Sequence, residues 1–361
     1  MKATEFEPAP KRRGQWLAIP LLMSVPGIAL AQTAAPAAPK PSDAQTTAPA
    51  PAPAPAPKPS LMSLPLPATL SDQARTAITT KAAANPVKNP SIAESRVFLD
   101  KFQHIRGDAQ RKKYAVDITE SVMAGVNVRI ISPQGMKGPS RRVFLNLHGG
   151  GFAGDSGTMT ENIPIAALTG IQVVAVRYRL APENPFPAQV EDSLAVYREL
   201  LKTHKASDIG IYGTSAGAIL GPELLMRIRA EKLPMPAVLG VFSGDGDLTR
   251  RGDSTQFFDL NEDLLNTIYL GGSKTAAADP MVSPLLGDLK GFPPTMCMTS
   301  TRDFFLSSTS NFCLALEKAG VENKLVVFDG LPHAFWAYID APESDQAFEI
   351  MARFLKGRFR P

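Results

Sequence analysis

A serine placed between two glycines is the first feature of this sequence that could do chemistry. The motif GTSAG occupies residues 213–217, directly after the apolar run 209–212 and directly before a helical stretch. In a strand–turn–helix context, this spacing strains the backbone at the serine and lifts its hydroxyl above the edge of a sheet, where it can attack a carbonyl carbon. The same letters also occur in Gly-Ser turns that have no role. The context nevertheless favours Ser215 as a nucleophile.

Such a hydroxyl needs a general base, and histidine is the usual one. The sequence contains four histidines, His104, His148, His204 and His333. Where a serine occupies a strand-to-helix turn of this kind, the chain order is nucleophile, acid and then histidine. Only His333 follows Ser215, and it comes shortly after the apolar run 325–328. We therefore predict that His333 is the base and that His104 and His204 are surface residues.

The acid that orients the imidazole must then lie between the nucleophile and the base. Fourteen carboxylates fall between Ser215 and His333. Asp303 follows the apolar run 295–298, at the carboxyl end of a predicted strand, where open α/β sheets place their sites. Asp329 also ends a predicted strand, but it is only four residues from His333. We predict Asp303 as the acid and keep Asp329 as the fallback.

A glycine-rich segment supplies the last element that acyl transfer requires. Residues 148–152, His-Gly-Gly-Gly-Phe, follow the apolar run 143–147. Glycines let backbone N–H groups approach a tetrahedral intermediate and stabilise its negative oxygen. We predict Gly150 and Gly151, with the amide of Ala216, as the oxyanion-hole donors, and we expect His148 to bond the loop backbone. Glycine-rich turns also cradle phosphate, but the sequence patterns of phosphate-binding loops are missing here.

The elements that must position these residues alternate between strands and helices. Residues 114–118 and 126–130 alternate apolar and polar side chains, which predicts a half-exposed hairpin at a sheet edge. One helix is predicted from apolar residues at helical spacing between Val190 and Leu201. Continuous apolar runs, typical of buried strands, cover residues 143–147, 173–176, 209–212, 237–242, 295–298 and 325–328. The fold class is therefore α/β, with a mostly parallel sheet flanked by helices.

The first 60 residues differ from the rest of the chain. A basic cluster at residues 11–13 precedes an apolar stretch, 16–30, and Ala-Leu-Ala at 29–31 has the small-x-small pattern that signal peptidase requires. We predict a signal peptide over residues 1–31, cleaved after Ala31, and hence a periplasmic or secreted protein without a stable membrane span. Residues 32–60 form an Ala/Pro-rich linker, which is either a stiff spacer near the cell envelope or a disordered tail.

Charge and cysteine content exclude several classes of function. The net charge is +4 for the whole chain but only +1 for residues 61–361, the predicted catalytic domain. A nearly neutral domain is poor evidence for nucleic-acid binding. Two cysteines, Cys297 and Cys313, cannot make a disulfide scaffold or a four-cysteine zinc site. They are either buried free thiols or one disulfide. No metal and no organic cofactor is expected.

Together these motifs resemble the hormone-sensitive-lipase-like branch of the α/β-hydrolase superfamily, the bacterial carboxylesterases that carry HGGG. The resemblance implies an eight-stranded sheet, a triad of Ser215, Asp303 and His333, and a helical cap built from about 61–112 and 246–285. It covers roughly residues 85–358 and includes YRLAPE at 178–183, FPA at 186–188, DP at 279–280, SP at 283–284 and GFPP at 291–294. Departures from the usual family pattern leave the substrate preference open; they are Thr214, Ala218-Ile219 and Ser307.

We predict an exported serine carboxylesterase that hydrolyses esters of small or medium acyl chains through an acyl-enzyme. A lactone hydrolase with the same triad is the nearest alternative. A non-catalytic ligand-binding protein on the same fold is the alternative from another class. Aromatic residues that flank the predicted catalytic residues are candidates for the substrate pocket, or else belong to the core: Phe152, Phe305, Phe335 and Trp336. A homodimer is left open.

Overall fold

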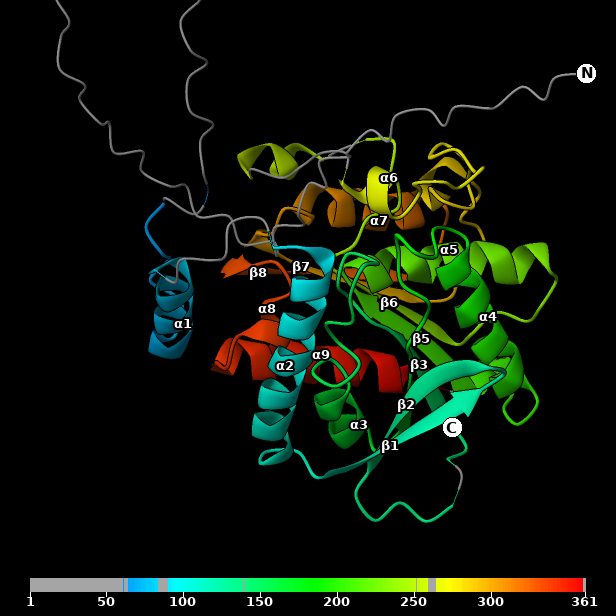
Figure 1. Ribbon diagram of the computed structural model, residues 1–361, viewed down its shortest axis with the longest axis horizontal. Coiled ribbons are helices and arrows are strands. Elements are labelled where there is room, and N and C mark those ends of the chain that lie inside the picture. The colour runs from blue at the N-terminus through cyan, green and yellow to red at the C-terminus, as the bar shows by residue number, and fades with distance from the viewer. Residues whose placement is uncertain are drawn as a thin grey trace, which may run out of the picture.

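An eight-stranded sheet crosses the centre of the protein, with helices on both of its sides (Figure 1). The computed structural model describes residue 61 and residues 64–83, 90–138, 140–250, 252–258 and 264–359. The predicted signal peptide, 1–31, and the predicted linker, 32–60, lie outside the described residues. The fold is therefore that of the predicted catalytic domain.

The sheet is mostly parallel, as predicted. Its strands are Val116–Met123 (β1), Val126–Pro133 (β2), Val143–Leu147 (β3), Gln172–Val176 (β4), Ile209–Thr214 (β5), Val238–Phe242 (β6), Thr295–Arg302 (β7) and Asn323–Pro332 (β8). They follow the order β1-β2-β4-β3-β5-β6-β7-β8 across the sheet. β2 pairs antiparallel with both β1 and β4, and all other neighbours are parallel. The predicted hairpin and the predicted eight-stranded sheet are confirmed.

Two strands differ in exposure from what their residue patterns predicted. The second hairpin strand, β2, is more buried than predicted: only Asn127 is exposed, and even Arg129 is 6% exposed, because β2 lies inside the sheet, where two helices pack against it. Conversely, Leu325 and Val327 in β8 are 41% and 43% exposed, because β8 is the last strand of the sheet. In both cases, exposure depends on where the strand lies within the sheet, and a local sequence pattern does not reveal that position.

Helices cover both faces of the sheet. They are Asp72–Ala83 (α1), Ile92–Arg111 (α2), Ile163–Thr169 (α3), Ala188–Leu201 (α4), Ala216–Ala230 (α5), Leu264–Ile268 (α6), Leu306–Lys318 (α7), Phe335–Tyr338 (α8) and Pro342–Gly357 (α9), with 3-10 turns at Ala206–Asp208 (η2), Asp253–Phe257 (η3) and Pro284–Leu286 (η4). α4, α5 and α7 pack on one face, and α1, α3, α8 and α9 pack on the other (Figure 1). Among the described helices, none has both the length and the apolar character that crossing a membrane would demand.

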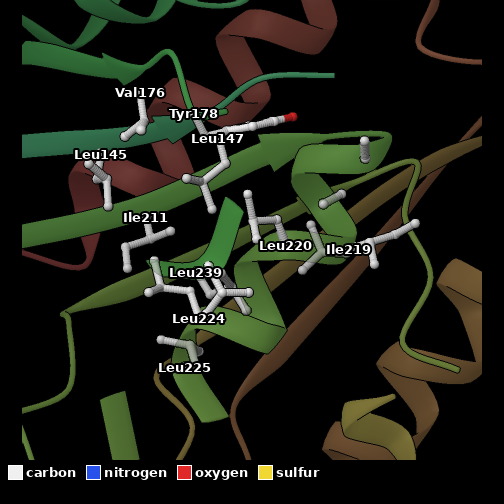
Figure 2. Close-up of a cluster of buried hydrophobic side chains, with 14 of the residues drawn as sticks. Leu145, Leu147, Val176, Tyr178, Ile211, Ile219, Leu220, Leu224, Leu225 and Leu239 are labelled. Atoms are coloured by element: carbon white, nitrogen blue, oxygen red, sulfur yellow. The ribbon is translucent and has the colours of Figure 1, made fainter. Parts of the chain in front are cut away.

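Two hydrophobic clusters, one on each face of the sheet, hold these layers together. Figure 2 shows part of the first cluster, where leucines of α5 lie close to apolar side chains of β3, β5 and β6. Neighbouring residues of one strand enter opposite clusters: in β6, Val241 belongs to the first and Phe242 to the second. Since side chains of a strand point alternately to its two faces, this is the burial expected of strands covered on both sides.

Helix α2 lies against the loop that follows β3. It begins with a capping box, in which Ser91 and Glu94 each accept the backbone N–H of the other. One turn later, Nε of Arg96 donates to the carbonyl of Ala153 at 2.6 Å. This contact joins the first of the two predicted cap segments to the glycine-rich loop.

The segment after β6 also contacts this loop. The ring of Tyr269, just beyond α6, stacks on Phe152 with a centroid distance of 3.5 Å and an interplanar angle of 3°. The hydroxyl of Tyr269 donates to the carboxyl of Glu223 on α5. Parts of both predicted cap segments, residues 84–89 and 259–263, lie outside the described residues. Their organisation as a separate cap stays a prediction.

Candidate active site

Four loops at one edge of the sheet carry the residues with predicted chemistry. Because β3, β5, β6, β7 and β8 are parallel neighbours, their carboxyl ends meet at the same edge. The glycine-rich segment follows β3, Ser215 follows β5, Asp303 follows β7 and His333 follows β8. Open α/β sheets place their sites at this edge.

Ser215 has a strained backbone conformation at the turn between β5 and α5. Its φ is 57° and its ψ is −119°, a combination that costs a residue with a side chain on the order of 1–3 kcal/mol. Backbone hydrogen bonds hold it there: its N–H donates to the carbonyl of Phe242 at 2.9 Å, and its own carbonyl accepts the N–H of Ala218 at 2.9 Å. Because of this turn, the Ser215 hydroxyl points away from the axis of α5 and reaches a neighbouring loop.

The two glycines of the motif are required by space. A Cβ on Gly217 would lie 1.8 Å from the carbonyl oxygen of Leu147, and a Cβ on Gly213 would lie 2.4 Å from the backbone of Gly217. Neither glycine has a left-handed φ. Close approach between α5, β5 and β3 therefore demands glycine at both positions, and this packing fixes where the serine stands.

The side chains of Ser215, His333 and Asp303 form a continuous hydrogen-bonded chain. Nε2 of His333 lies 2.9 Å from Oγ of Ser215, and Nδ1 lies 2.8 Å from Oδ1 of Asp303. The chain is shielded from solvent, since Ser215 is 7% exposed and Asp303 is fully buried. The structure thus brings together the three residues predicted from the sequence, in the order of nucleophile, base and orienting acid.

Asp303 is a buried carboxylate that is stabilised by several donors. Burial acts to raise its pKa, but the imidazole of His333 and hydrogen bonds from His333, Ser243 and Phe305 together lower the pKa below its ordinary value. Oδ2 accepts the hydroxyls of Ser243 and of Thr299, the latter at 3.0 Å, and Oδ1 accepts the N–H of Phe305 at 2.9 Å. An ionised Asp303 keeps the proton of the imidazole on Nδ1, which leaves Nε2 able to accept another.

Asp329, the fallback acid, is bonded elsewhere. Its carboxylate is exposed and accepts the hydroxyls of Thr301 at 3.1 Å and of Thr69 at 3.5 Å. Within the described residues, its carboxylate makes no hydrogen bond with His333. The geometry therefore favours Asp303 as the acid.

The first peptide unit inside the glycine-rich loop has a fixed orientation. The carbonyl of Gly149 accepts the N–H of Ser156 at 3.2 Å and lies 2.7 Å from Nδ1 of His148. In a trans peptide, the C=O of one residue and the N–H of the next point in opposite directions. Anchoring this carbonyl therefore directs the N–H of Gly150 away from the loop interior.

The next peptide unit is held in the same way. The carbonyl of Gly150 accepts the N–H groups of Ala153 at 3.2 Å and Gly154 at 3.0 Å, which directs the N–H of Gly151 to the opposite side. Gly150 has a φ of 118°, and a Cβ there would lie 2.1 Å from the carbonyl oxygen of Gly154. Only glycine therefore permits this turn.

The amides of the predicted oxyanion hole find no acceptor within the part of the chain that the structure describes. No hydrogen bond from the N–H groups of Gly150, Gly151 and Ala216 to another described residue is formed. The amide of Ala216 belongs to the first residue of α5, so it also lies at the positive end of the helix dipole. Unbonded backbone donors of this kind are what a developing oxyanion requires.

His148 bonds the loop backbone, as predicted. It is fully buried, and its ring stacks on Tyr178 with a centroid distance of 4.0 Å. The hydroxyl of Tyr178 donates to the carbonyl of His148 at 2.7 Å. Burial lowers the pKa of His148, so this imidazole is a neutral structural group.

Comparison with known proteins agrees with this geometry. The profile of a family described as having the alpha/beta hydrolase fold matches residues 144–337, a range that contains Ser215, Asp303 and His333. An acetyl-hydrolase of Streptomyces hygroscopicus is 33% identical over 230 residues, which cover 60% of this chain and 75% of that protein. An esterase of Acinetobacter venetianus is 32% identical over 253 residues, which cover 66% of this chain and 82% of that protein.

The family match spans more than half of the chain. This chain is an α/β-hydrolase. The crystal structure of esterase E25 superposes on the hydrolase with a TM-score of 0.70 at 30% identity, covering 82% of this chain and 97% of that one. An esterase from the bacterial hormone-sensitive lipase family gives a TM-score of 0.68 at 28% identity, covering 80% of this chain and 99% of that one. The predicted fold class and the resemblance to the hormone-sensitive-lipase-like branch are confirmed.

The aromatic residues proposed for the substrate pocket occupy different environments in the hydrolase. Phe305 packs against the imidazole of His333 with a centroid distance of 5.6 Å. Phe152 is fully buried beneath Tyr269. Phe335 and Trp336 are 0% and 1% exposed, and they belong to the hydrophobic cluster on the opposite face of the sheet.

Phe335 and Trp336 are therefore core residues, not pocket residues. Ala334 has a left-handed φ of 50°, which turns the chain directly after His333. The indole N–H of Trp336 donates to the hydroxyl of Thr214 at 3.4 Å. Proximity in sequence to a catalytic residue does not determine which side of such a turn the next side chain takes.

Sequence reasoning missed several side chains that surround Ser215, His333 and Asp303. The ring of Phe304 lies 4.2 Å from the imidazole of His333, closer than Phe305. Ser243 and Thr299 bond the acid, and Glu161 bonds the glycine-rich loop. Ser243 directly follows β6, so its place after a buried strand at the site edge was an available signal. No local pattern marks Glu161.

Other candidate chemistry has no support among the described residues. No group of three or more His, Cys, Asp or Glu side chains there could hold a metal ion. Cys297 and Cys313 are both buried and do not form a disulfide. His104 is exposed and His204 is half-buried, and both bond residues of their own surroundings. The site of the hydrolase is therefore built from Ser215 and the residues around it.

Proposed function

We propose that this α/β-hydrolase is an exported serine carboxylesterase in which Ser215 is the nucleophile, His333 the general base and Asp303 the orienting acid. The chain is an enzyme of the carboxylic ester hydrolase class, since its named relatives and its structural neighbours are esterases. The observation that carries the catalytic assignment is the hydrogen-bonded chain from Ser215 through His333 to Asp303.

Acylation follows from this geometry. Nε2 of His333 takes the proton of the Ser215 hydroxyl while Oγ attacks the ester carbonyl carbon. The carbonyl oxygen becomes negative in the tetrahedral intermediate, and the unbonded amides of Gly150, Gly151 and Ala216 supply its hydrogen bonds. The imidazolium then gives its proton to the leaving alcohol, and the acyl group stays on Ser215.

Deacylation uses the same groups in the same order. His333 removes a proton from a water molecule, whose oxygen attacks the acyl carbon. The same three amides stabilise the second tetrahedral intermediate. When this intermediate collapses, His333 returns the proton to Ser215, and the carboxylic acid leaves. Asp303 remains ionised throughout, because its donors hold its pKa below the ordinary value.

The substrate is a small-molecule ester with a short or medium acyl chain. Ser215 is only 7% exposed, and the rings of Phe304 and Phe305 pack on the imidazole of His333, which supports a sheltered apolar site. One relative is an acetyl-hydrolase. A cyclic ester could meet the same three groups, so lactone hydrolysis is the second candidate. The complete triad geometry weighs against a non-catalytic ligand-binding protein.

We make a separate proposal for the N-terminal 60 residues. We assign residues 1–31 to a cleaved signal peptide and 32–60 to a linker that holds residues 61–361 near the cell envelope, on the basis of their composition. A periplasmic or secreted location follows. Neither nucleic acid nor a metal takes part in the proposed reaction, and a homodimer is compatible with it.

Hydrolysis of p-nitrophenyl esters of increasing acyl length, with a lactone panel in parallel, tests the proposed reaction. We expect release from short and medium chains, and a loss of at least about 10³-fold in kcat for Ser215→Ala. Absence of release from every ester and lactone would reject the esterase assignment, and undiminished activity of Ser215→Ala would reject the nucleophile. A preference for lactones over esters would favour the second candidate.

N-terminal sequencing of the protein recovered from a producing cell tests the export proposal. We expect the mature chain to begin at Gln32 and to be found outside the cytoplasm. A chain that retains Met1 would contradict the assignment of the leader, without bearing on the catalytic residues.

A further inference from the structure

A buried carboxyl lies directly against the glycine-rich loop, and the proposed mechanism does not use it. Glu161 is 3% exposed, and its Oε1 accepts the N–H of Gly149 at 3.2 Å. Its Oε2 accepts Nδ2 of Asn146, on β3, at 3.3 Å. The carboxyl also bonds the side chain of Thr214, which precedes the nucleophile on β5. Glu161 therefore connects the glycine-rich loop with β3 and β5, two of the strands that carry the site.

The loop is shaped around this carboxyl. A Cβ on Gly157 would lie 1.9 Å from Oε1 of Glu161, and Gly157 has no left-handed φ that would require glycine for another reason. The N–H of Glu161 donates to the carbonyl of Gly157 at 3.0 Å. The chain thus folds back over the carboxyl and leaves no room for a side chain at residue 157. The position of the carboxyl is set by packing as well as by hydrogen bonds.

Glu161 completes the anchoring of the loop. The carbonyl of His148 accepts the Tyr178 hydroxyl at 2.7 Å, and the N–H on the other side of the same peptide unit, that of Gly149, donates to Glu161. Both polar groups of this unit are therefore bonded, so it cannot rotate without breaking two hydrogen bonds. The two following units carry the amides of the proposed oxyanion hole, and rotation of the first unit would turn them away.

We infer that Glu161 is a positioning residue for the proposed esterase reaction: its carboxyl accepts the N–H of Gly149 and thereby keeps the amides of Gly150 and Gly151 directed at the oxyanion. The inference rests on the proposed function, because it assigns a role within the same site. Glu161 does not touch the substrate in this role and acts only through the loop.

The surroundings of Glu161 favour its neutral form. Burial raises the pKa of the carboxyl to about 8, against smaller lowering effects of hydrogen bonds from Asn146, the Gly149 N–H and Thr214. Asp155, on the same loop, is a charged group that faces it, and its negative charge raises the pKa further. Three tyrosines whose own pKa values are raised complete the titratable surroundings: Tyr178, Tyr212 and Tyr338. The carboxyl is therefore neutral at pH 7 and ionises above about pH 8.

The charge of the Glu161 carboxyl matters because the amides of the neighbouring loop must stabilise a negative oxygen. A neutral carboxyl still accepts the Gly149 N–H through one oxygen, so it anchors the loop without adding charge. An ionised carboxyl bonded to the first amide of the loop would oppose the negative charge that develops at the next two amides. Ionisation of Glu161 should therefore lower kcat on the alkaline side, while substrate binding in the ground state stays nearly constant.

Two substitutions separate anchoring from charge. Glu161→Ala removes the acceptor of the Gly149 N–H, and we expect kcat to fall about 10- to 100-fold with KM within about threefold of the parent. Glu161→Gln keeps an oxygen acceptor of the same size without a titratable proton, so it should retain most of the kcat that Glu161→Ala loses. Circular dichroism and thermal unfolding of each variant monitor the fold.

The pH profile is the deciding measurement, and it remains informative if Glu161→Ala does not fold. Initial rates with p-nitrophenyl acetate are measured from pH 6 to 9.5, with Ser215→Ala as the blank for spontaneous hydrolysis. We expect kcat of the parent to decline above about pH 8, and Glu161→Gln to lack this decline. Glu223→Gln is the matched control, because Glu223 is also fully buried with a raised pKa but bonds Tyr269 instead of the loop.

Each result supports or contradicts the positioning role of Glu161. Glu223→Gln should keep the alkaline decline of the parent. A parent profile that stays flat to pH 9.5, a Glu161→Gln profile that declines like the parent, or a Glu161→Ala kcat within about threefold of the parent would overturn it. If the parent is active, Ser215→Ala is inactive and one of these results is found, only the role of Glu161 fails and the proposed function stands. If Ser215→Ala stays active, the proposed function itself fails.

Discussion

Gly217, in the first turn of α5, lies so close to β3 that a methyl group on its Cα would be 1.8 Å from the carbonyl oxygen of Leu147. Helix α5, which follows Ser215, is therefore in backbone contact with β3, the strand that precedes the glycine-rich loop. One contact sets the separation between the two halves of the proposed site, the serine on one side and the loop amides on the other. Gly217 is therefore needed more for this close approach between helix and strand than for the conformational freedom of its backbone.

Gly217→Ala should therefore damage both stability and activity. The clash is with backbone atoms, which cannot move aside as a side chain can, so we expect a loss of about 3 kcal/mol in the free energy of unfolding. Activity on a p-nitrophenyl ester should fall more than the folded fraction. Gly221→Ala, one turn later in the same helix, is the control, because its Cβ would meet only the flexible Leu239 side chain at 3.2 Å. Equal behaviour of the two variants in urea unfolding would contradict this account.

Asp303→Asn should lower kcat by about 10⁴-fold while leaving the fold intact. The amide would present a donor to Nδ1 of His333 and favour the wrong tautomer of the imidazole. The comparison is Asp329→Asn, because Asp329 is exposed and bonds only threonine hydroxyls among the described residues. We expect its kcat to stay within about threefold of the parent. The reverse ranking in steady-state kinetics would return the role of the acid to Asp329.

Ser243→Ala tests how strongly the acid depends on its neighbours. Ser243 has a left-handed φ of 55°, which alanine tolerates no better and no worse than serine, so the substitution isolates the hydroxyl. Its loss removes one donor from Oδ2 of Asp303 and leaves Thr299 as the other. We expect kcat to fall about 3- to 10-fold and the pKa of Asp303 to rise. Thr299→Val should have a similar effect, and the double variant should lose more than the sum of the two in free energy, because Oδ2 then lacks both hydroxyl donors.

The sequence predicted that Ser215, His333 and Asp303 would lie together, because the evidence it offers concerns chain order and the ends of strands. Ser215 and His333 were selected by a motif and by elimination, and a parallel sheet necessarily brings the ends of β5, β7 and β8 to one edge. The same reasoning could not place Phe335 and Trp336, because the left-handed turn at Ala334 decides their direction. It could not find Glu161 either, since the contact of Glu161 with Gly149 depends on how the loop folds back at Gly157.

For the strands as well, local sequence patterns predicted the positions, whereas contacts between distant segments decided the exposure. Six continuous apolar runs located β3 to β8, since burial on both faces of a parallel sheet leaves such a signal, and alternation of apolar and polar residues located β1 and β2. Exposure was wrong for β2 and β8 because it depends on the strand order of the sheet. That order is decided by crossovers between distant segments, for example the return of β3 between β4 and β5.

The stability of the protein should depend on pH through Glu161. Its pKa is about 8 in the folded state against an ordinary value of 4.5, so the folded state binds this proton more tightly than the unfolded state does. The resulting stabilisation is complete below pH 4.5 and is lost as pH rises through 8, on the order of 1 kcal/mol per pH unit. Glu161→Gln should therefore gain stability relative to the parent between pH 5 and pH 8. Urea unfolding at both pH values measures the difference, and a constant difference would contradict the assigned ionisation.

The pair of Tyr269 and Glu223 leads to a prediction about the segment after β6. The Tyr269 hydroxyl donates to one carboxyl oxygen of Glu223, and the other oxygen, Oε1, is buried without a partner among the described residues. Tyr269→Phe keeps the stacking on Phe152 but leaves the whole buried carboxyl unbonded, which should cost about 2 kcal/mol in the free energy of unfolding.

In a Glu223→Leu background the same tyrosine substitution should cost much less, because no buried acceptor then remains to be satisfied. A double-mutant cycle by urea unfolding measures this coupling. Since Tyr269 stacks on the residue that follows Gly151, the cycle should be repeated with kcat as the readout. If Tyr269→Phe lowers stability but leaves kcat unchanged, the bond holds the segment after β6 in place without orienting the oxyanion loop. If both fall together, and both recover in the Glu223→Leu background, the segment supports the loop through the Phe152 stack.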